Sequence, residues 1–393
     1  MKIVADENIL TLSGKKSKNI NWVLKSGREI TSADVADADA LLVRSVTKVD
    51  AALLGDSSVR FVATATSGTD HLDLDWLAAR GIGVADAAGA NANAVAEYVL
   101  AALAELILED DLALWDKTVA VIGVGNVGTA LIRKLKALGV TCVACDPLQQ
   151  RVSKIDYVSL EQALQADIIC LHTPLTHEGP HATFNLINDE RLHTMNPDAV
   201  LVNAGRGEVI DNNALLAHLQ RFPDRRVVLD VWANEPRPSA QLLDRVFIGT
   251  PHIAGYSVEA KLAASQCVFN ALSSHFSLDR LQLNVGAGGP LRVHDQRYEQ
   301  KSESLLYCEK TDARMFASIV TRSFGLRALY RRFNDIYQVA SRSDNPMDGA
   351  EVFDSIRREL TERREFGATH VHAAGFSPRL SAWLHAAGFV LQA

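Results

Sequence analysis

Three residues with chemically active side chains follow short apolar runs in the second half of the chain. Arg206 lies in NAGRG, Glu235 in VWANEP and His252 in TPHIAGY. A carboxylate that holds an imidazole fixes its tautomer and stabilises its protonated form, so a Glu235–His252 pair suits general acid–base catalysis. Arg206, with glycines beside it, can grip a substrate carboxylate through two hydrogen bonds. Singly, each residue also fits a structural role, and only the combination indicates catalysis.

Buried parallel strands are the elements that must position these three residues. The apolar runs that precede them are residues 199–203, 227–231 and 246–248. In an open α/β sheet, ligands bind at the carboxyl ends of the strands. The pattern therefore predicts that the three side chains lie along one edge of one sheet.

A glycine-rich stretch at residues 118–139 predicts what else binds at that edge. An apolar run at residues 119–122 leads into Gly123, Gly125 and Gly128, and a helical pattern follows. These glycines allow a tight turn, the approach of a pyrophosphate and close helix–strand packing. Asp146 follows the next strand, about 20 residues further on, where a carboxylate accepts hydrogen bonds from a ribose. We expect a dinucleotide site that favours NAD over NADP.

The remaining pattern predicts two α/β units. A further strand is expected at residues 168–172, so that six parallel strands form a doubly wound Rossmann-type sheet. Ser159 and Asp211 are expected to cap helices, and residues 91–109 form a long helix that leads into this domain. Before it, strand-like runs at residues 2–5, 38–43, 59–65 and 82–85 alternate with helical stretches and indicate a smaller α/β unit.

Two literal motif matches carry no function in this interpretation. The H-E-x-x-H match at residues 177–181 contains Gly179 and Pro180, which break the helix that a zinc site needs, so a loop is expected and no metal. Cys142 and Cys145 form a C-x-x-C match within an apolar strand, where cysteine behaves as a small core residue. His71 and Asp73 are expected at a helix N-terminus.

The composition excludes several classes of protein. The 393 residues exceed what one core supports, so two or three domains are expected. The 40 basic and 47 acidic residues give a net charge of −7, which argues against a nucleic-acid-binding surface. Five scattered cysteines, an N-terminus with acids by position six, and no long apolar run predict a cytoplasmic protein without membrane segments.

Taken together, the motifs resemble the D-isomer-specific 2-hydroxyacid dehydrogenases over residues 34–268. The segments that carry the resemblance are GVGNVG, CDP, HTPLT, NAGRG, VLDVW-x-x-EP and HIAGY. The resemblance implies that Arg206 binds the substrate carboxylate, Glu235 orients the base and His252 exchanges the proton. It implies an NAD site made by Gly123, Gly125, Asn126, Val127, Gly128, Asp146, Thr173, Asp230 and Gly255.

Within that family, VRSVTKV and ATSGTDHLD are similar to enzymes that oxidise 4-phosphoerythronate in pyridoxal 5′-phosphate synthesis. This similarity implies substrate contacts from Arg44, Ser45, Thr66 and Tyr256, and a phosphorylated 2-hydroxy acid as substrate. A strand that ends in Arg44 and Ser45 also offers donors suited to a phosphoryl oxygen. The alternatives are another 2-hydroxyacid dehydrogenase, such as one for 3-phosphoglycerate, or a non-catalytic NAD(H)-sensing regulator.

The resemblance also implies three domains. Residues 1–92 and 256–285 form a flavodoxin-like substrate-binding domain, residues 93–255 an NAD-binding Rossmann domain, and residues 286–393 a small C-terminal α/β domain that makes a homodimer. Within the last, RRELTERRE has acids and bases at helical spacing. We expect it to form a solvated helix face.

Overall fold

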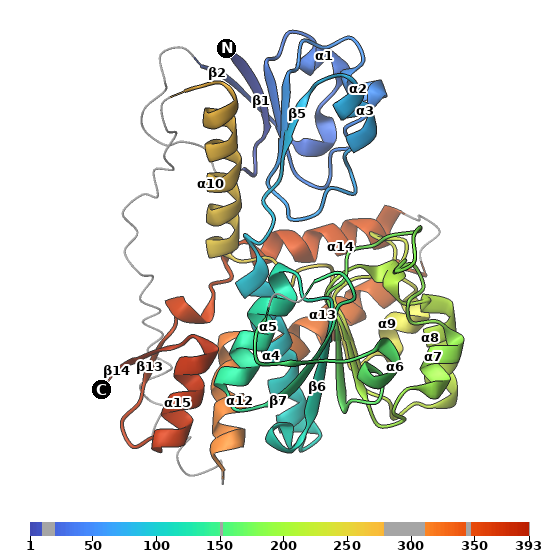
Figure 1. Cartoon of the computed structure of the whole chain (residues 1–393), viewed down its shortest axis with the longest axis vertical. Helices are drawn as coiled ribbons and strands as arrows, with labels where there is room; N and C mark the ends of the chain where they lie inside the picture. The colour runs from blue at the N-terminus through green and yellow to red at the C-terminus, as the bar shows by residue number, and fades with distance from the viewer. Residues whose placement is uncertain (10–19, 150–151, 279–310, 343–346, 393) are drawn as a thin grey trace. The chain divides into compact units, whose positions relative to one another are not determined.

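Two large parallel sheets organise the chain, and each belongs to its own unit. The structure, a computed structural model, describes residues 1–9, 20–149, 152–278, 311–342 and 347–392. One unit contains residues 1–91 and 257–278, and the other contains residues 92–256 and 311–392 (Figure 1). The three-domain division stays a prediction, since the described C-terminal residues group with the Rossmann residues in the second unit.

The first unit has a five-stranded sheet in the order β2-β1-β3-β4-β5, the flavodoxin-like topology that the resemblance implied. All its strands are parallel: β1 (Lys2–Asp6), β2 (Asn21–Lys25), β3 (Ala40–Val43), β4 (Phe61–Thr64) and β5 (Gly83–Ala85). Its helices are α1 (Ser32–Val35), α2 (Ala51–Leu54), α3 (Leu74–Ala79) and α10 (Val258–His275). The sequence pattern missed β2, because this edge strand is only half-buried and shows no apolar alternation.

The second unit contains a seven-stranded parallel sheet, in the order β12-β11-β10-β9-β6-β7-β8. Its strands are β6 (Thr118–Ile122), β7 (Thr141–Cys145), β8 (Asp156–Tyr157), β9 (Ile168–Leu171), β10 (Val200–Asn203), β11 (Val227–Leu229) and β12 (Ile248–Gly249). The expected number of six was wrong by one strand, since β8 has two residues and leaves no periodic signal. The doubly wound Rossmann topology is confirmed, with the strand order reversing between β6 and β9.

Helices cover this second sheet, and the predicted caps are present. They are α4 (Ala92–Glu109), α5 (Asn126–Ala137), α6 (Leu160–Ala163), α7 (Asp189–Thr194), α8 (Asn212–Arg221) and α9 (Ala240–Arg245). Ser159 forms a capping box with Gln162 at α6, and Asp211 accepts from two backbone N–H groups of α8. Helix α4 is buried along almost its whole length and packs against α5.

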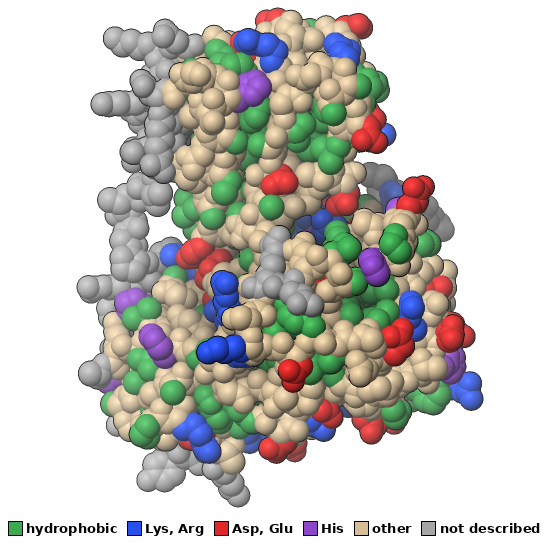
Figure 2. Space-filling view, viewed as in Figure 1, with side chains coloured by type: hydrophobic (Ala, Val, Ile, Leu, Met, Phe, Trp, Pro, Cys, Tyr) green, Lys and Arg blue, Asp and Glu red, His purple; other side chains and the backbone are tan. Residues whose placement is uncertain are grey.

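The described C-terminal residues add four helices and a small parallel sheet to the second unit. The elements are α12 (Asp312–Ser323), α13 (Leu326–Ala340), α14 (Met347–Glu359), α15 (Pro378–Ala387), β13 (His370–His372) and β14 (Val390–Gln392). Phe316 and Phe333 belong to the same apolar core as the Rossmann strands. On the face shown in Figure 2, acidic and basic side chains are interspersed. Within the described residues, no helix is long and apolar enough to span a membrane.

The two motif matches have the structures that the sequence predicted. No helix covers residues 177–181, and Gly179 has a φ of +90°. Cys142 and Cys145 lie on β7, and burial raises the pKa of the Cys142 thiol to about 12 and that of the Cys145 thiol to about 11. Neither thiol is therefore a reactive thiolate at neutral pH.

Candidate active site

The glycine loop after β6 has the geometry of a pyrophosphate cradle. Gly123 has a φ of +89°, which favours glycine. A Cβ on Gly128 would lie 2.0 Å from the carbonyl oxygen of Gly123, so α5 approaches the loop too closely for any side chain. A Cβ on Gly125 would meet nothing within 4 Å. The loop therefore leaves open space beside Gly125, at the N-terminus of α5, where a pyrophosphate binds in this architecture.

The Asp146 carboxylate lies beside this loop, directly after β7. Its Oδ2 accepts a hydrogen bond from the Val124 backbone N–H at 2.8 Å, and its Oδ1 accepts from Leu148 at 2.9 Å and Gln149 at 3.0 Å. These bonds fix the carboxylate against the glycine turn. A ribose hydroxyl that reached this position would find an oriented acceptor.

Buried polar atoms without partners lie on the adjacent strand end. The Thr173 hydroxyl and both ring nitrogens of His172, after β9, make no hydrogen bond with any described residue. Burial lowers the pKa of His172 to about 4, so its imidazole is neutral. Buried polar groups are rarely left unpaired, so an unpaired hydroxyl at the switch point fits a ligand-binding position. Helix α5, which follows the neighbouring strand β6, begins with Asn126 and Val127.

Arg206 follows β10 in a tightly held turn. The Asn203 side chain donates to the carbonyl oxygen of Arg206 at 2.9 Å and accepts from the Gly205 N–H at 3.0 Å. A Cβ on Gly207 would lie 2.0 Å from the backbone carbonyl carbon of Trp232, so only glycine fits after the arginine. The Arg206 guanidinium donates to the Gly205 carbonyl oxygen at 3.0 Å. The flanking residues thus fix the backbone from which the guanidinium extends.

Glu235 and His252 form the pair that the sequence predicted. His252 Nδ1 and Glu235 Oε2 are 2.7 Å apart, and Glu235 Oε1 accepts from the Trp232 backbone N–H at 2.9 Å. Burial opposes ionisation of Glu235, but the neighbouring His252, the two hydrogen bonds and the charge of Arg357 together lower its pKa. The ionised carboxylate fixes the imidazole, which is 39% exposed, so Nε2 is the nitrogen that can exchange a proton with a ligand.

Asp230 holds the loop that carries His252. Its buried carboxylate accepts hydrogen bonds from the Ile253 N–H and the Thr250 hydroxyl, both at 2.7 Å, and from the Ala254 N–H at 2.8 Å. Burial raises the pKa of Asp230, which these bonds oppose. His252 itself has a φ of +54°, a conformation that costs about 1–3 kcal/mol in a non-glycine residue. The loop geometry is therefore imposed by its partners.

The end of the loop is held from the C-terminal region. After Gly255, Tyr256 accepts on its backbone carbonyl from Arg363 Nη1 at 3.2 Å, and the Ala254 carbonyl accepts from the same nitrogen at 2.9 Å. Arg363 also donates to the Ala94 carbonyl at 2.9 Å. Its guanidinium is buried, which lowers its pKa to about 10. The buried Arg363 guanidinium thus connects α4 with the loop that carries His252.

A second C-terminal arginine contacts the Tyr256 side chain. Arg357 Nη2, on α14, donates to the Tyr256 hydroxyl at 2.9 Å. The expectation that RRELTERRE is a solvated helix face was wrong at these two arginines, whereas Arg358 is exposed as predicted. The sequence signal was ambiguous, because interleaved charges at helical spacing look the same whether or not two of them turn inward.

The predicted substrate residues of the first unit lie at its strand ends. After β3, Arg44 Nε donates to Asp6 Oδ2 at 3.1 Å, and Asp6 is fully buried. Ser45 follows and is exposed. After β4, the Thr66 hydroxyl is 2.7 Å from that of Thr64. The unit therefore presents a guanidinium and two hydroxyl side chains at the carboxyl ends of neighbouring strands.

His71 and Asp73 have structural partners in the same unit. His71 Nε2 lies 2.9 Å from the Thr64 hydroxyl, and the Asp73 carboxylate accepts from the Trp76 N–H at 3.1 Å. The predicted helix N-terminus is confirmed, because Asp73 caps α3. In the described part of the chain, no group of three or more His, Cys, Asp or Glu side chains could hold a metal ion.

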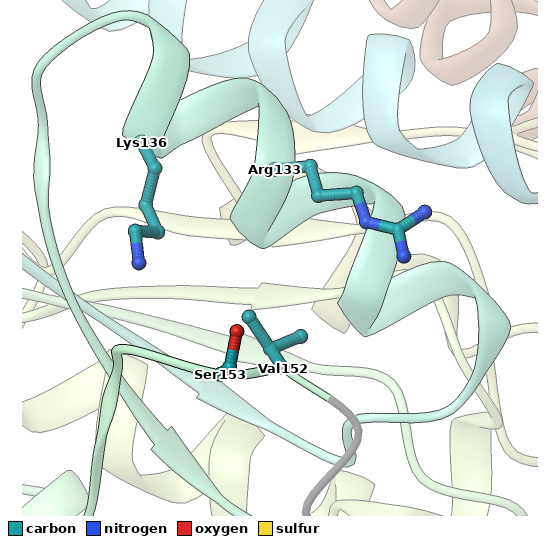
Figure 3. A pocket seen from close by; sticks show the side chains of 4 residues that line it. All are labelled: Arg133, Lys136, Val152 and Ser153. Carbon is teal, nitrogen blue, oxygen red and sulfur yellow. The ribbon is translucent and has the colours of Figure 1, made fainter.

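A cavity of about 310 Å³ lies elsewhere in the second unit, lined by Arg133, Lys136, Val152 and Ser153 (Figure 3). Its two cations come from the second half of α5. Lys136 is ten residues beyond Asn126, roughly 15 Å along the helix axis from the N-terminus that faces the glycine loop. The cavity contains none of the predicted site residues.

Comparison with known proteins finds a family and several relatives to which the chain is similar. Residues 107–254 match the family model of the D-isomer specific 2-hydroxyacid dehydrogenase, NAD binding domain. The chain is 40% identical to an erythronate-4-phosphate dehydrogenase of Marinobacter nauticus over 100% of both chains, and 46% identical to one of Escherichia coli over 94% of both. A D-lactate dehydrogenase of Aquifex aeolicus, solved with NAD and lactic acid, has the same fold, with 22% identity and a TM-score of 0.56 over 70% of this chain and 96% of that chain.

Proposed function

The chain belongs to the D-isomer specific 2-hydroxyacid dehydrogenases, which use NAD, and we propose that it oxidises the 2-hydroxyl of 4-phosphoerythronate to the 2-oxo acid phosphate. One observation carries the proposal: the Glu235–His252 pair is assembled at 2.7 Å in the same unit as the glycine loop. Residues for proton exchange and residues for NAD binding thus share one sheet. NAD held at the glycine loop and Asp146 would supply the acceptor for the hydride of the substrate carbon.

His252 takes the proton of the substrate hydroxyl. Glu235 is ionised and accepts from Nδ1, which directs the basic lone pair of the neutral imidazole to Nε2. When the ring takes up the proton, the same carboxylate stabilises the imidazolium. Since the Trp232 N–H holds the carboxylate and the carboxylate holds the imidazole, little reorganisation is needed during the reaction.

Arg206 binds the substrate carboxylate and the oxygen that becomes the carbonyl. A guanidinium offers two parallel donors to a carboxylate and keeps its charge at any working pH. The neighbouring backbone is fixed by Asn203 and by the close packing of Gly207. Arg206 therefore supplies orientation and electrostatic stabilisation of the developing carbonyl.

Specificity for a phosphorylated substrate is assigned to Arg44, Ser45, Thr66 and Tyr256. The similar proteins from Marinobacter nauticus and Escherichia coli are named as dehydrogenases of erythronate 4-phosphate. Arg44 and Ser45 follow β3 and offer a guanidinium and a hydroxyl to a phosphoryl group. The reaction would supply the 2-oxo acid phosphate for pyridoxal 5′-phosphate synthesis, in the cytoplasm.

We further propose that the protein forms homodimers through its C-terminal region. Helix α13 carries two large apolar side chains that are exposed, Ile336 at 41% and Val339 at 73%. Residues three apart lie on one face of a helix, so the two form an apolar patch suited to a second copy. Sedimentation of the wild type and of Val339→Glu tests this, and a monomeric wild type would contradict it.

The substrate is tested by following NADH absorbance with a panel of 2-hydroxy acids. We expect turnover of 4-phosphoerythronate with a much larger kcat/KM than for 3-phosphoglycerate or lactate. Equal activity on lactate and 4-phosphoerythronate would overturn the substrate assignment. A preference for 3-phosphoglycerate would indicate the related dehydrogenase, and NAD binding with no turnover of any acid would indicate a regulator.

A further inference from the structure

Two arginines from the C-terminal region hold the loop that carries the catalytic histidine. Arg363 donates to the carbonyl oxygens of Ala254 and Tyr256, and Arg357 donates to the Tyr256 hydroxyl. Asp230 binds the N–H groups at the beginning of the same loop. The loop is therefore fixed at its start by a Rossmann residue and at its end by residues 357 and 363.

The Arg357 guanidinium contacts Tyr256 and two residues of its own helix, Phe353 and Asp354. Its guanidinium carbon lies 5.2 Å from the centre of the Tyr256 ring and 5.7 Å from that of Phe353, so the charge packs near two aromatic rings. Its Nη1 is 3.5 Å from Asp354 Oδ1. The side chain is only 14% exposed. This burial and the aromatic contacts restrict the guanidinium to one position, from which it orients the Tyr256 hydroxyl.

Arg357 also influences the catalytic pair electrostatically. Its positive charge is one of the contributions that lower the pKa of Glu235, after those of His252 and the Trp232 N–H. The effect on Glu235 is long-range, since Arg357 makes no hydrogen bond to Glu235 within the described residues. The geometry thus connects one C-terminal side chain with two residues of the site.

We propose that Arg357 is a positioning residue of the active site, which orients the Tyr256 hydroxyl toward the substrate and makes the C-terminal region part of the catalytic machinery. The inference rests on the proposed function for the identity of the substrate only. Because Arg357 acts through Tyr256, its loss misplaces a substrate contact while the glycine loop is unchanged. Misplacement of a positioning group costs about tenfold or more in turnover.

The test is a double-mutant cycle with Arg357→Met and Tyr256→Phe. We expect Arg357→Met to reduce kcat/KM for the 2-hydroxy acid by about tenfold or more while the Kd for NAD is unchanged. In the Tyr256→Phe background, the same change should have a smaller effect on kcat/KM, limited to the loss of the positive charge near Glu235. Arg358→Met, which removes the same charge from the exposed neighbouring position, is the matched control and should behave as wild type.

Two outcomes overturn the proposal. One is an equal effect of the Arg357 and Arg358 variants, and the other is an undiminished effect of Arg357→Met in the Tyr256→Phe background. If Arg357→Met does not fold, the cycle is run with Arg357→Lys, which keeps the positive charge but replaces the planar guanidinium with an ammonium group. A loss of kcat/KM in Arg357→Lys that becomes smaller in the Tyr256→Phe background supports a positioning role.

A second measurement is independent of the substrate. Amide exchange of residues 253–258 should be faster in Arg357→Met than in Arg358→Met, because the end of the loop loses one of its two arginine contacts. If no 2-hydroxy acid is turned over, the proposed function fails while this measurement still decides the inference. Equal exchange in the two variants would show that Arg357 does not hold the loop.

Discussion

At the scale of single residues, the first prediction concerns the proton acceptor. His252→Ala should reduce turnover by about 10²–10⁴-fold, because the imidazole is the group of the Glu235–His252 pair that takes the substrate proton. NAD should still bind, since the glycine loop and Asp146 do not depend on the imidazole. Steady-state kinetics and NAD titration of the variant measure the two effects separately. Loss of NAD binding together with activity would mean that His252 has another role.

Glu97 allows a prediction about pH and stability. It is 1% exposed on α4, and burial raises its pKa to about 7 in spite of Lys134 at 3.5 Å and a hydrogen bond from the Phe366 N–H. The folded state therefore holds the Glu97 proton more tightly than the unfolded chain, whose pKa is ordinary. This contribution to the free energy of unfolding is present below about pH 4.5 and is lost as the pH rises to about 7, by about 3 kcal/mol.

Glu97→Gln should remove this dependence. We expect the decrease in the free energy of unfolding from pH 5 to pH 8 to be smaller in the variant than in the wild type. Urea denaturation at the two pH values measures it. The buried His172 and His218, whose pKa values are also shifted, are the same in both proteins and cancel in the comparison. Parallel pH profiles would contradict the assignment.

The sequence could predict the Glu235–His252 pair but not the arginines that hold its loop. Glu235 and His252 each follow a recognisable apolar run, and the sheet brings successive strand ends to one edge. Arg357 and Arg363 lie in a charged helical segment more than 100 residues later. Their inward orientation depends on the packing of α14 and of the segment after it, which no local pattern specifies.

At the scale of elements, the strands with continuous apolar runs were predictable, and of the four short edge strands β5 and β12 were predicted but β2 and β8 were not. β3, β4 and β9 are wholly buried and have four apolar or small residues in a row. β2 and β8 form only because a neighbouring strand offers unpaired backbone groups. Tertiary context therefore decides these two edge strands, whereas local pattern was enough to predict the buried strands.

Gly125 and Gly128 test the turn between β6 and α5. Gly128→Ala places a Cβ 2.0 Å from the Gly123 carbonyl oxygen, and we expect a loss of about 1–3 kcal/mol in stability. Gly125→Ala places a Cβ in open space, so its melting temperature should equal that of wild type while its Kd for NAD rises by about tenfold or more. Melting curves with and without NAD measure both. Normal NAD affinity in Gly125→Ala would contradict the predicted pyrophosphate position.

At the scale of the whole molecule, the described C-terminal residues share a core with the Rossmann sheet. Helix α12 packs against α4, and Trp115 stacks on Trp383 with ring centroids 3.8 Å apart. The Tyr330 and Tyr337 hydroxyls donate to the carbonyl oxygens of Leu243 and Pro238, both at 2.9 Å. Since these contacts are buried, separating α12 and α13 from the sheet would expose apolar surface and unpaired polar groups.

This shared core predicts that NAD stabilises the C-terminal helices although they are not predicted to touch it. Suppose that the second unit unfolds cooperatively, so that its slowest amides exchange only when the whole unit opens. NAD at 100 times its Kd then raises the free energy of that opening by about 2.7 kcal/mol, and each of these amides is protected by the same amount. The slowest amides of α12 should therefore gain the same protection as those of β6, which hydrogen–deuterium exchange with and without NAD measures. Gly125→Ala provides the control. At the same NAD concentration, its weaker binding of NAD should reduce the added protection of α12 and of β6 equally. Protection confined to β6 would mean that α12 opens independently, and that the core it shares with α4 is too weak to couple the C-terminal region to the cofactor.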